Sequence, residues 1–285
     1  MSIMSTLAKN PLIRSSYEGV LGAGFIPRRA FAHFFINDSG LKSQIHLQNY
    51  YSFFFPDSLT AATATVWLHD HSGKQIAKKS FEVAPFGQLY LGIEDILGKD
   101  IPMEGMVYVD LKPPRIIRKQ MKTLPNLLGV EANTPFWVSF RDENENYMYV
   151  HSIESYRGKV FGAMWPLNKV MEKAPPQRDE WSSWRLLDVN LLDEFQIVVM
   201  NHSRVQGNTT LKVFDQGNNV VWSKEIKLEP RESNRVRIPS EEISRWKELR
   251  DVSEVRIGLT ALMTSNGKPY VMMRYGGGPL SLHHG

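Results

Sequence analysis

Apolar and polar residues alternate along most of this chain with the period of two that is typical of β-strands. The alternation is clearest in residues 45–48, 81–84 and 88–93, and it returns in residues 225–229 and 235–238. Turn-forming residues separate the runs, at a spacing that suits hairpins. The pattern predicts an all-β fold of tandem antiparallel β-sandwich modules, Ig-like or jelly-roll-like, with short helical insertions.

The same pattern occurs twice. Residues 45–49 resemble residues 197–201, and both stretches end in an asparagine. Residues 66–85 resemble residues 211–230, and both of these stretches end in a proline. The sequence therefore predicts two copies of one fold.

The predicted modules cover residues 30–152 and 183–285, and each supplies about seven short strands, as a sandwich requires. Residues 1–29 form an N-terminal arm, and residues 112–133 are an insertion that belongs to the first copy alone. The linker, residues 153–182, is rich in Pro, Lys and Trp. We expect the two modules to pack through this linker.

Local signals place the turns and helices within the modules. Residues 70–73, 215–218 and 265–268 are predicted to close hairpins, because Asp, Asn and Gly accept the backbone conformations of tight turns. A short helix is predicted at residues 240–249, where a serine precedes two glutamates. Its shorter counterpart in the first copy is predicted at residues 94–97.

Composition narrows the class of protein. The chain has 285 residues, of which 42% are hydrophobic, and this is enough for two globular cores. The absence of cysteine excludes disulfides and thiol chemistry. A net charge of +4 is too small to indicate nucleic acid, and no apolar run is long enough to span a membrane. We expect a cytoplasmic protein that does not bind nucleic acid and does not span a membrane.

The second copy resembles the sensory rhodopsin transducer family of small β-sandwich proteins. The likeness is carried by the strand that ends in Asn201, residues 211–215, residues 226–230, residues 234–238 and the strand after Ser265. The resemblance implies a non-enzymatic, oligomer-forming binding or transducer module. None of the matching residues is catalytic.

Histidines suggest a polar ligand site. His151 and His283 hold similar places at the ends of the two modules, and His284 and Arg274 lie nearby in the sequence. These four residues are candidates to line equivalent pockets for an anionic or polyhydroxy ligand. The alternative is that each histidine only completes the end of a strand.

A metal site is a weaker hypothesis. His69 and His71 have the spacing that places two imidazoles on one side of a strand. The carboxylate that a cupin-type metal site needs shortly after them is missing, because Lys74 and Gln75 occupy its place. We therefore expect no cofactor and no metal.

Aromatic residues indicate an interface. The loop after Asn49 contains five aromatic residues and is longer than its counterpart after Asn201, and Trp67 is expected to point out of its strand. An exposed aromatic patch favours association, so these residues are candidates for contact with a protein partner or a second copy. The alternative is that the loop folds back onto the core. The candidates are Tyr50, Tyr51, Phe53, Phe54, Phe55 and Trp67.

Together these features favour a non-catalytic binding or adaptor protein that forms oligomers. The alternative is a metal- or carboxylate-dependent enzyme that acts on a carbohydrate or another polar small molecule.

Overall fold

A computed structural model describes residues 29–117, 136–156, 180–182, 186–201, 206–260 and 269–284 of the chain. Its described strands pair only in antiparallel fashion, and three short helices, α3 (Tyr51–Phe54), α4 (Ile93–Leu97) and α7 (Ser240–Glu248), lie beside them. The all-β sandwich fold predicted from the alternation is confirmed. Most of the N-terminal arm, the insertion and the linker lies outside the described residues, as do Trp165, Trp184 and the side chain of Trp181.

Module 1 consists of the first nine strands, arranged in two layers. The outer layer has the order β5-β2-β7-β8, made of β5 (Gln88–Gly92), β2 (Leu41–Gln48), β7 (Trp137–Asp142) and β8 (Tyr147–His151). The inner layer has the order β4-β3-β6-β1-β9, made of β4 (Gln75–Val83), β3 (Ala62–Asp70), β6 (Met103–Lys112), β1 (Arg29–Asn37) and β9 (Ile153–Tyr156). The two layers join at one point, where Asn37 of β1 meets Lys42 of β2.

Module 2 consists of the remaining strands, again in two layers. One sheet has the order β15-β12-β17-β18, made of β15 (Ser233–Arg237), β12 (Leu192–Met200), β17 (Tyr270–Tyr275) and β18 (Ser281–His284). The other has the order β10-β16-β13-β14, made of β10 (Glu180–Ser182), β16 (Glu254–Thr260), β13 (Gly207–Asp215) and β14 (Val220–Leu228), with β11 (Leu187–Asp188) beside β16.

The pairing order in module 2 follows that in module 1. In each module a hairpin, β3-β4 or β13-β14, lies beside a later strand, β6 or β16. The central strand of the other sheet, β2 or β12, ends one residue before the repeated asparagine. A common origin of the two modules by duplication stays a prediction, but the strand order is the one that it requires.

The repeated asparagines, Asn49 and Asn201, make equivalent hydrogen bonds in the two modules. Asn49 is buried, and its Nδ2 donates to the carbonyl oxygens of Val83 (3.2 Å) and Ala84 (3.1 Å). Asn201 is also buried, and its Nδ2 donates to the carbonyl oxygens of Leu228 (3.1 Å) and Glu229 (3.0 Å). Each amide therefore ties its strand to the turn that leads into the next edge strand.

Two of the helices close the sandwich edges. Helix α7 (Ser240–Glu248) buries Ile243 and Trp246, and α4 (Ile93–Leu97) buries Ile93 and Ile96. Gly98 ends α4 in the left-handed conformation, at φ 78°, which favours glycine. Both helices lie where the sequence predicted them. No helix among the described residues is long and apolar enough to cross a membrane.

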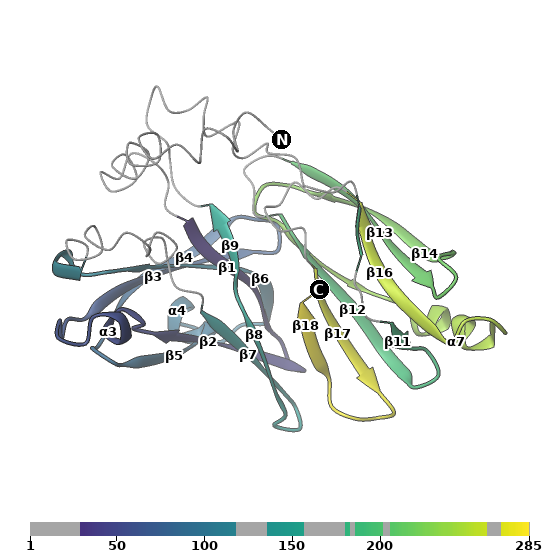
Figure 1. Ribbon diagram of the computed structural model, residues 1–285, viewed down its shortest axis with the longest axis horizontal. Coiled ribbons are helices and arrows are strands. Elements are labelled where there is room, and N and C mark those ends of the chain that lie inside the picture. The colour runs from purple at the N-terminus through teal and green to yellow at the C-terminus, as the bar shows by residue number, and fades with distance from the viewer. Residues whose placement is uncertain are drawn as a thin grey trace.

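The four sheets stack on one another, as Figure 1 shows. The sheet β15-β12-β17-β18 packs one face against its own module and the other against the inner layer of module 1. Val198, Met200 and Tyr270 on that second face belong to one apolar cluster with the core of module 1. The modules therefore pack sheet against sheet. The prediction that they pack through the linker stays untested, because most linker residues lie outside the described ones.

Polar contacts fix the register of this packing. The Arg235 guanidinium, of which 8% is exposed, lies 3.2 Å from Asp38 Oδ2 and 3.5 Å from Glu104 Oε2. The backbone N–H of Ser233 donates to the carbonyl oxygen of His71 at 3.1 Å.

The ends of the predicted linker are strands, since β9 pairs with β1 and β10 pairs with β16. The first four and last three residues of the predicted linker thus pair with modules 1 and 2, and the bounds of the modules stay a prediction.

Candidate functional site

The histidines and the arginine proposed from the sequence do not share one pocket. His151 ends β8, and its ring lies edge-on to Trp137 at 5.7 Å between centroids. Arg274 lies four residues beyond Tyr270 on β17, and it contacts Glu194 Oε2 at 3.3 Å and the carbonyl oxygen of Gly278 at 3.0 Å. Tyr270 donates to the carbonyl oxygen of His151, so Arg274 lies about 13 Å further along the strand.

Strand register also changes the proposed pairing of histidines. His151 lies opposite Trp137, and His284 lies opposite Tyr270 on the corresponding strand of module 2. His284 thus occupies the position of His151, and the expected match with His283 is wrong by one residue. His283 lies opposite Val271 and is exposed, and the side chain of His284 lies outside the described part of the chain.

His69 and His71 do not point at a common site. His69 is buried, and its ring lies edge-on to Tyr108 at 5.1 Å. His71 lies in the turn after β3, where it is exposed. Among the described residues, no group of three or more His, Asp or Glu side chains could hold a metal ion.

The aromatic loop is divided between core and surface. Tyr51 is fully buried in α3 (Tyr51–Phe54), where its hydroxyl donates to the carbonyl oxygen of Leu111 at 2.8 Å. Phe55 is also buried, so these two rings are core rather than interface. Phe53 and Phe54 are about half exposed, Tyr50 is partly buried, and Trp67 lies partly buried under the Lys78 ammonium.

A second group of aromatic residues, which the sequence analysis missed, covers the free side of the outer layer of module 1. Four of its rings are 42–55% exposed. Strand alternation brings them together, because apolar Met148 and Val150 point inward between them. We call this surface the aromatic face; it consists of His46, Tyr90, Trp137, Tyr147, Tyr149 and His151.

The rings form a row across the strands. Pairing places Tyr90 opposite His46, His46 opposite Trp137, and Trp137 opposite His151. Three strand spacings make this row about 14 Å long. Tyr149 lies beside the row, with its centroid 5.4 Å from that of His46, and Tyr147 stacks on Tyr149 at 6.2 Å. The result is an aromatic platform on one side of the sheet.

His46 holds the centre of the platform. Its Nε2 lies 2.7 Å from Ser139 Oγ, and its ring is perpendicular to that of Tyr90 at 4.9 Å. Burial lowers the pKa of His46 below its ordinary value of 6.5, so the ring is neutral at neutral pH. The centre of the aromatic face therefore carries no charge.

Charged residues lie only at one end of the face. Lys42 pairs with Asp100 at 2.8 Å, and Arg141 pairs with Glu145 at 3.2 Å. Glutamines flank the central row, since Gln44 and Gln48 lie on the same side of β2 as His46. The surface thus offers apolar ring faces beside neutral hydrogen-bonding groups.

The corresponding surface of module 2 is already occupied. Val198 corresponds to His46 and Tyr270 to Trp137, because each pair has the same place relative to the repeated asparagine and the same cross-strand partner. In module 2 these residues are buried against module 1. The same sheet face is therefore a docking surface in one module and remains open, with aromatic side chains, in the other.

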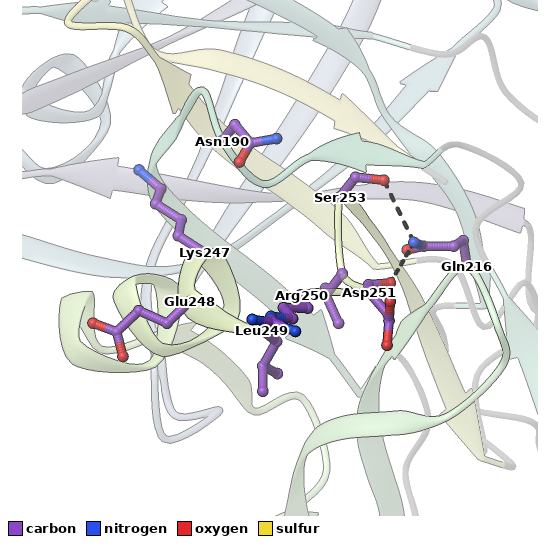
Figure 2. A pocket seen from close by; sticks show the side chains of 9 residues that line it. Asn190, Gln216, Lys247, Glu248, Leu249, Arg250, Asp251 and Ser253 are labelled. Carbon is purple, nitrogen blue, oxygen red and sulfur yellow. Dashed lines mark hydrogen bonds between the residues drawn. The ribbon is translucent and has the colours of Figure 1, made fainter.

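An open pocket of about 550 Å³ lies in module 2, between the end of α7 and the segment before β16. Figure 2 shows Gln216 held there by the carbonyl oxygen of Asp251 at 2.5 Å and by Ser253 Oγ at 3.4 Å. The cations Lys247 and Arg250 line it together with the anions Glu248 and Asp251. With mixed charge and an exposed lining, this pocket defines no ligand class.

No protein-family model and no curated protein matches the sequence. Among solved structures, a β-glucuronidase from Ruminococcus gnavus is 13% identical, with 91% of this chain and 36% of that chain covered and a TM-score of 0.18. An exo-chitosanase from Amycolatopsis orientalis is 10% identical, with 89% and 25% covered and a TM-score of 0.16. This chain thus spans about a third or less of their length. Likeness at this level carries no argument about the site.

Proposed function

We propose that this β-sandwich protein is a non-catalytic binding module whose aromatic face binds an extended carbohydrate chain. The observation that supports the proposal is the aromatic face, where four exposed rings lie together beside neutral polar groups on one side of a sheet. A sugar ring has an apolar C–H face and a polar rim of hydroxyl groups. It therefore stacks on an aromatic ring while its hydroxyl groups bond to nearby amides and imidazoles.

The shape of the surface favours a polymer over a small molecule. A pocket for a small ligand usually encloses most of the ligand's surface, and a flat sheet face does not. A chain laid along the row from Tyr90 to His151 would instead gain a modest contact at each ring. Affinity then depends on several stacked sugars, and it fails for a single one.

The wider role as an adaptor or transducer belongs to the same proposal. The likeness to sensory rhodopsin transducer proteins stays a prediction, and it is consistent with a module that binds without performing chemistry. It does not by itself identify the ligand.

Affinity electrophoresis in gels that contain soluble polysaccharides tests the proposal. Glucans, mannans, xylans, uronic acid polymers and amino-sugar polymers cover the main ligand chemistries. We expect at least one of these polymers to retard the protein, and calorimetry with the matching short oligosaccharide then gives an affinity. Trp137→Ala and Tyr149→Ala should each weaken that affinity about fivefold, because each removes one stacking contact worth about 1 kcal/mol.

Phe54→Ala is the matched control, since Phe54 is equally exposed but lies off the aromatic face. It should leave the affinity for the short oligosaccharide unchanged. Thermal melting verifies that every variant is folded. The proposal is abandoned if none of these polymers retards the protein, or if Trp137→Ala and Tyr149→Ala are both retarded as strongly as the wild type.

A further inference from the structure

The turn after β4 has the same pattern of backbone hydrogen bonds as the turn after β14. In module 1 the Gly87 N–H donates to the carbonyl oxygen of Ala84, and the Asn49 N–H donates to that of Gly87. In module 2 the Glu232 N–H donates to Glu229, and the Asn201 N–H donates to Glu232. The middle residue of each turn has positive φ, 55° at Phe86 and 69° at Arg231. Phe86 and Arg231 are therefore structural counterparts.

In module 2 this turn is a docking element. The Arg231 guanidinium lies over the Tyr108 ring at 5.0 Å from its centroid, and Nη1 donates to the Tyr108 hydroxyl at 3.1 Å. The adjacent Pro230 carbonyl oxygen packs so closely on Gly73 that a Cβ there would lie 2.4 Å from it. The turn thus helps to hold module 2 on module 1.

In module 1 the same turn is exposed and apolar. Phe86 is 45% exposed, and its ring lies edge-on to that of Phe53 in α3 at 5.6 Å. The backbone N–H of Phe86 donates to Ser52 Oγ at 3.0 Å, which fixes the turn against the helix. We use the name phenylalanine knob for Phe86 and Phe53 together with Phe54 and Leu59, which lie one and six residues after Phe53 in the chain; each of the four is 45–70% exposed.

The choice of residue at position 86 is costly without a partner. Positive φ is uncommon for bulky residues and is cheapest for glycine or asparagine. A phenylalanine in this conformation, with nearly half of its surface in water, is unfavourable in two ways. Its backbone is strained, and its apolar ring is exposed to water. Strain of this kind is most often kept where the side chain has a function.

We propose that two copies of this chain pair through their phenylalanine knobs about a two-fold axis. The chain itself shows that its modules associate through this turn, and the free turn lies at the end of the molecule away from module 2 (Figure 1). The four knob side chains carry no charge, so identical surfaces meet without repulsion between them. The inference concerns a different surface from the aromatic face and does not depend on carbohydrate binding.

The size of the knob sets the strength of the pair. Four side chains about half exposed offer on the order of 400 Å² per copy. This is below the area of a standard stable interface, which is about 800 Å² per partner. The pair is therefore a reversible dimer whose population rises with protein concentration.

Sedimentation equilibrium of the full chain over a wide concentration range tests the inference. The wild type should shift from one chain, 32.7 kDa, towards twice that mass as its concentration rises. The double variant Phe53→Ser/Phe86→Gly should remain a single chain throughout. Glycine accepts positive φ without strain, so the change at position 86 should not lower the melting temperature of the double variant. Circular dichroism verifies that this variant is folded.

Tyr149→Ala is the matched control, since it removes an equally exposed ring from the aromatic face and should leave the mass unchanged. A wild type that stays a single chain at all concentrations overturns the inference. So does a dimer that survives in Phe53→Ser/Phe86→Gly or dissociates in Tyr149→Ala. Oligosaccharide binding by the single-chain double variant separates this result from the fate of the proposed function.

Discussion

At the scale of single residues, two buried asparagines connect the strands of the modules through hydrogen bonds to the backbone. Asn49 and Asn201 are each almost fully buried, and each amide satisfies carbonyl oxygens at the turn that follows the β3-β4 or β13-β14 hairpin. A buried carbonyl oxygen without a donor costs about 1–3 kcal/mol. The repeat of this residue is therefore explained by the same structural need in both modules.

Replacing either asparagine should destabilise the fold. Asn49→Ala and Asn201→Ala should each lower the free energy of unfolding by about 2–3 kcal/mol, because the first leaves three carbonyl oxygens and the second leaves two without their donor. Urea unfolding measures the change. Asn144→Ala, at an exposed turn position, is the control and should stay within about 0.5 kcal/mol of the wild type. An equally small effect at Asn49 would show that water replaces the amide.

His46 gives the stability a pH dependence. Its folded-state pKa lies below 6.5 because burial disfavours the charged ring, so the unfolded chain binds the proton more readily. The stability linked to His46 is therefore complete above about pH 6.5 and is lost as the pH falls towards the folded-state pKa. His46→Gln should flatten this part of the curve of unfolding free energy against pH. Gln44→Ala on the same strand should leave it in place, and an unchanged slope in His46→Gln would contradict the assignment.

At the scale of elements, the contrast between β2 and β12 explains why one face is open and its counterpart is covered. β2 alternates buried and partly exposed residues along its whole length. In β12, every residue from Phe195 to Met200 is buried. A strand that is apolar on both faces lies between two layers, and a strand that alternates has one face in water. The apolar run Ile197–Met200 thus indicates, from the sequence alone, that β12 is covered on both faces.

The aromatic face could also have been found by the same reading. Tyr147, Tyr149 and His151 occupy alternate positions on β8, and Trp137 takes the matching position on β7. Alternation identifies these side chains as outward-pointing. It does not tell which strand lies beside which, so their meeting with His46 and Tyr90 could not be derived from the sequence.

At the scale of the whole molecule, one nearly buried cation lies at the junction between the two modules. Arg235 contacts Asp38 and Glu104 of module 1, and its Nε donates to Gln196 Oε1 at 2.6 Å. Because the two carboxylates are a third or more exposed, water weakens both ion pairs. The cation contributes by joining the modules in one register rather than by great strength.

Removing this cation should loosen the junction between the modules. Arg235→Ala should lower the stability by about 2 kcal/mol, because it leaves Asp38 and Glu104 facing each other near an apolar seam. We expect the single melting transition to broaden or split as module 2 separates first, which differential scanning calorimetry detects. Arg237→Ala, at an exposed position of the same strand, should change neither stability nor shape. A sharp, unshifted transition in Arg235→Ala would show that apolar packing alone holds the modules together.

The sequence by itself predicted the all-β class, helices α4 and α7, and the hairpin turns at residues 70–73 and 215–218, because these follow from local alternation and from turn chemistry within a few residues. The hairpin predicted at residues 265–268 lies outside the described residues, and helix α3 was not predicted. Tertiary structure alone decided which faces are open. Whether Tyr51 and Phe55 are core while Phe53 and Phe86 are exposed depends on what lies above each ring, and residues far apart in the chain supply that cover. That His284, and not His283, is the counterpart of His151 likewise follows from strand register. Long-range contacts fix this register, and the sequence alone leaves it uncertain by one residue.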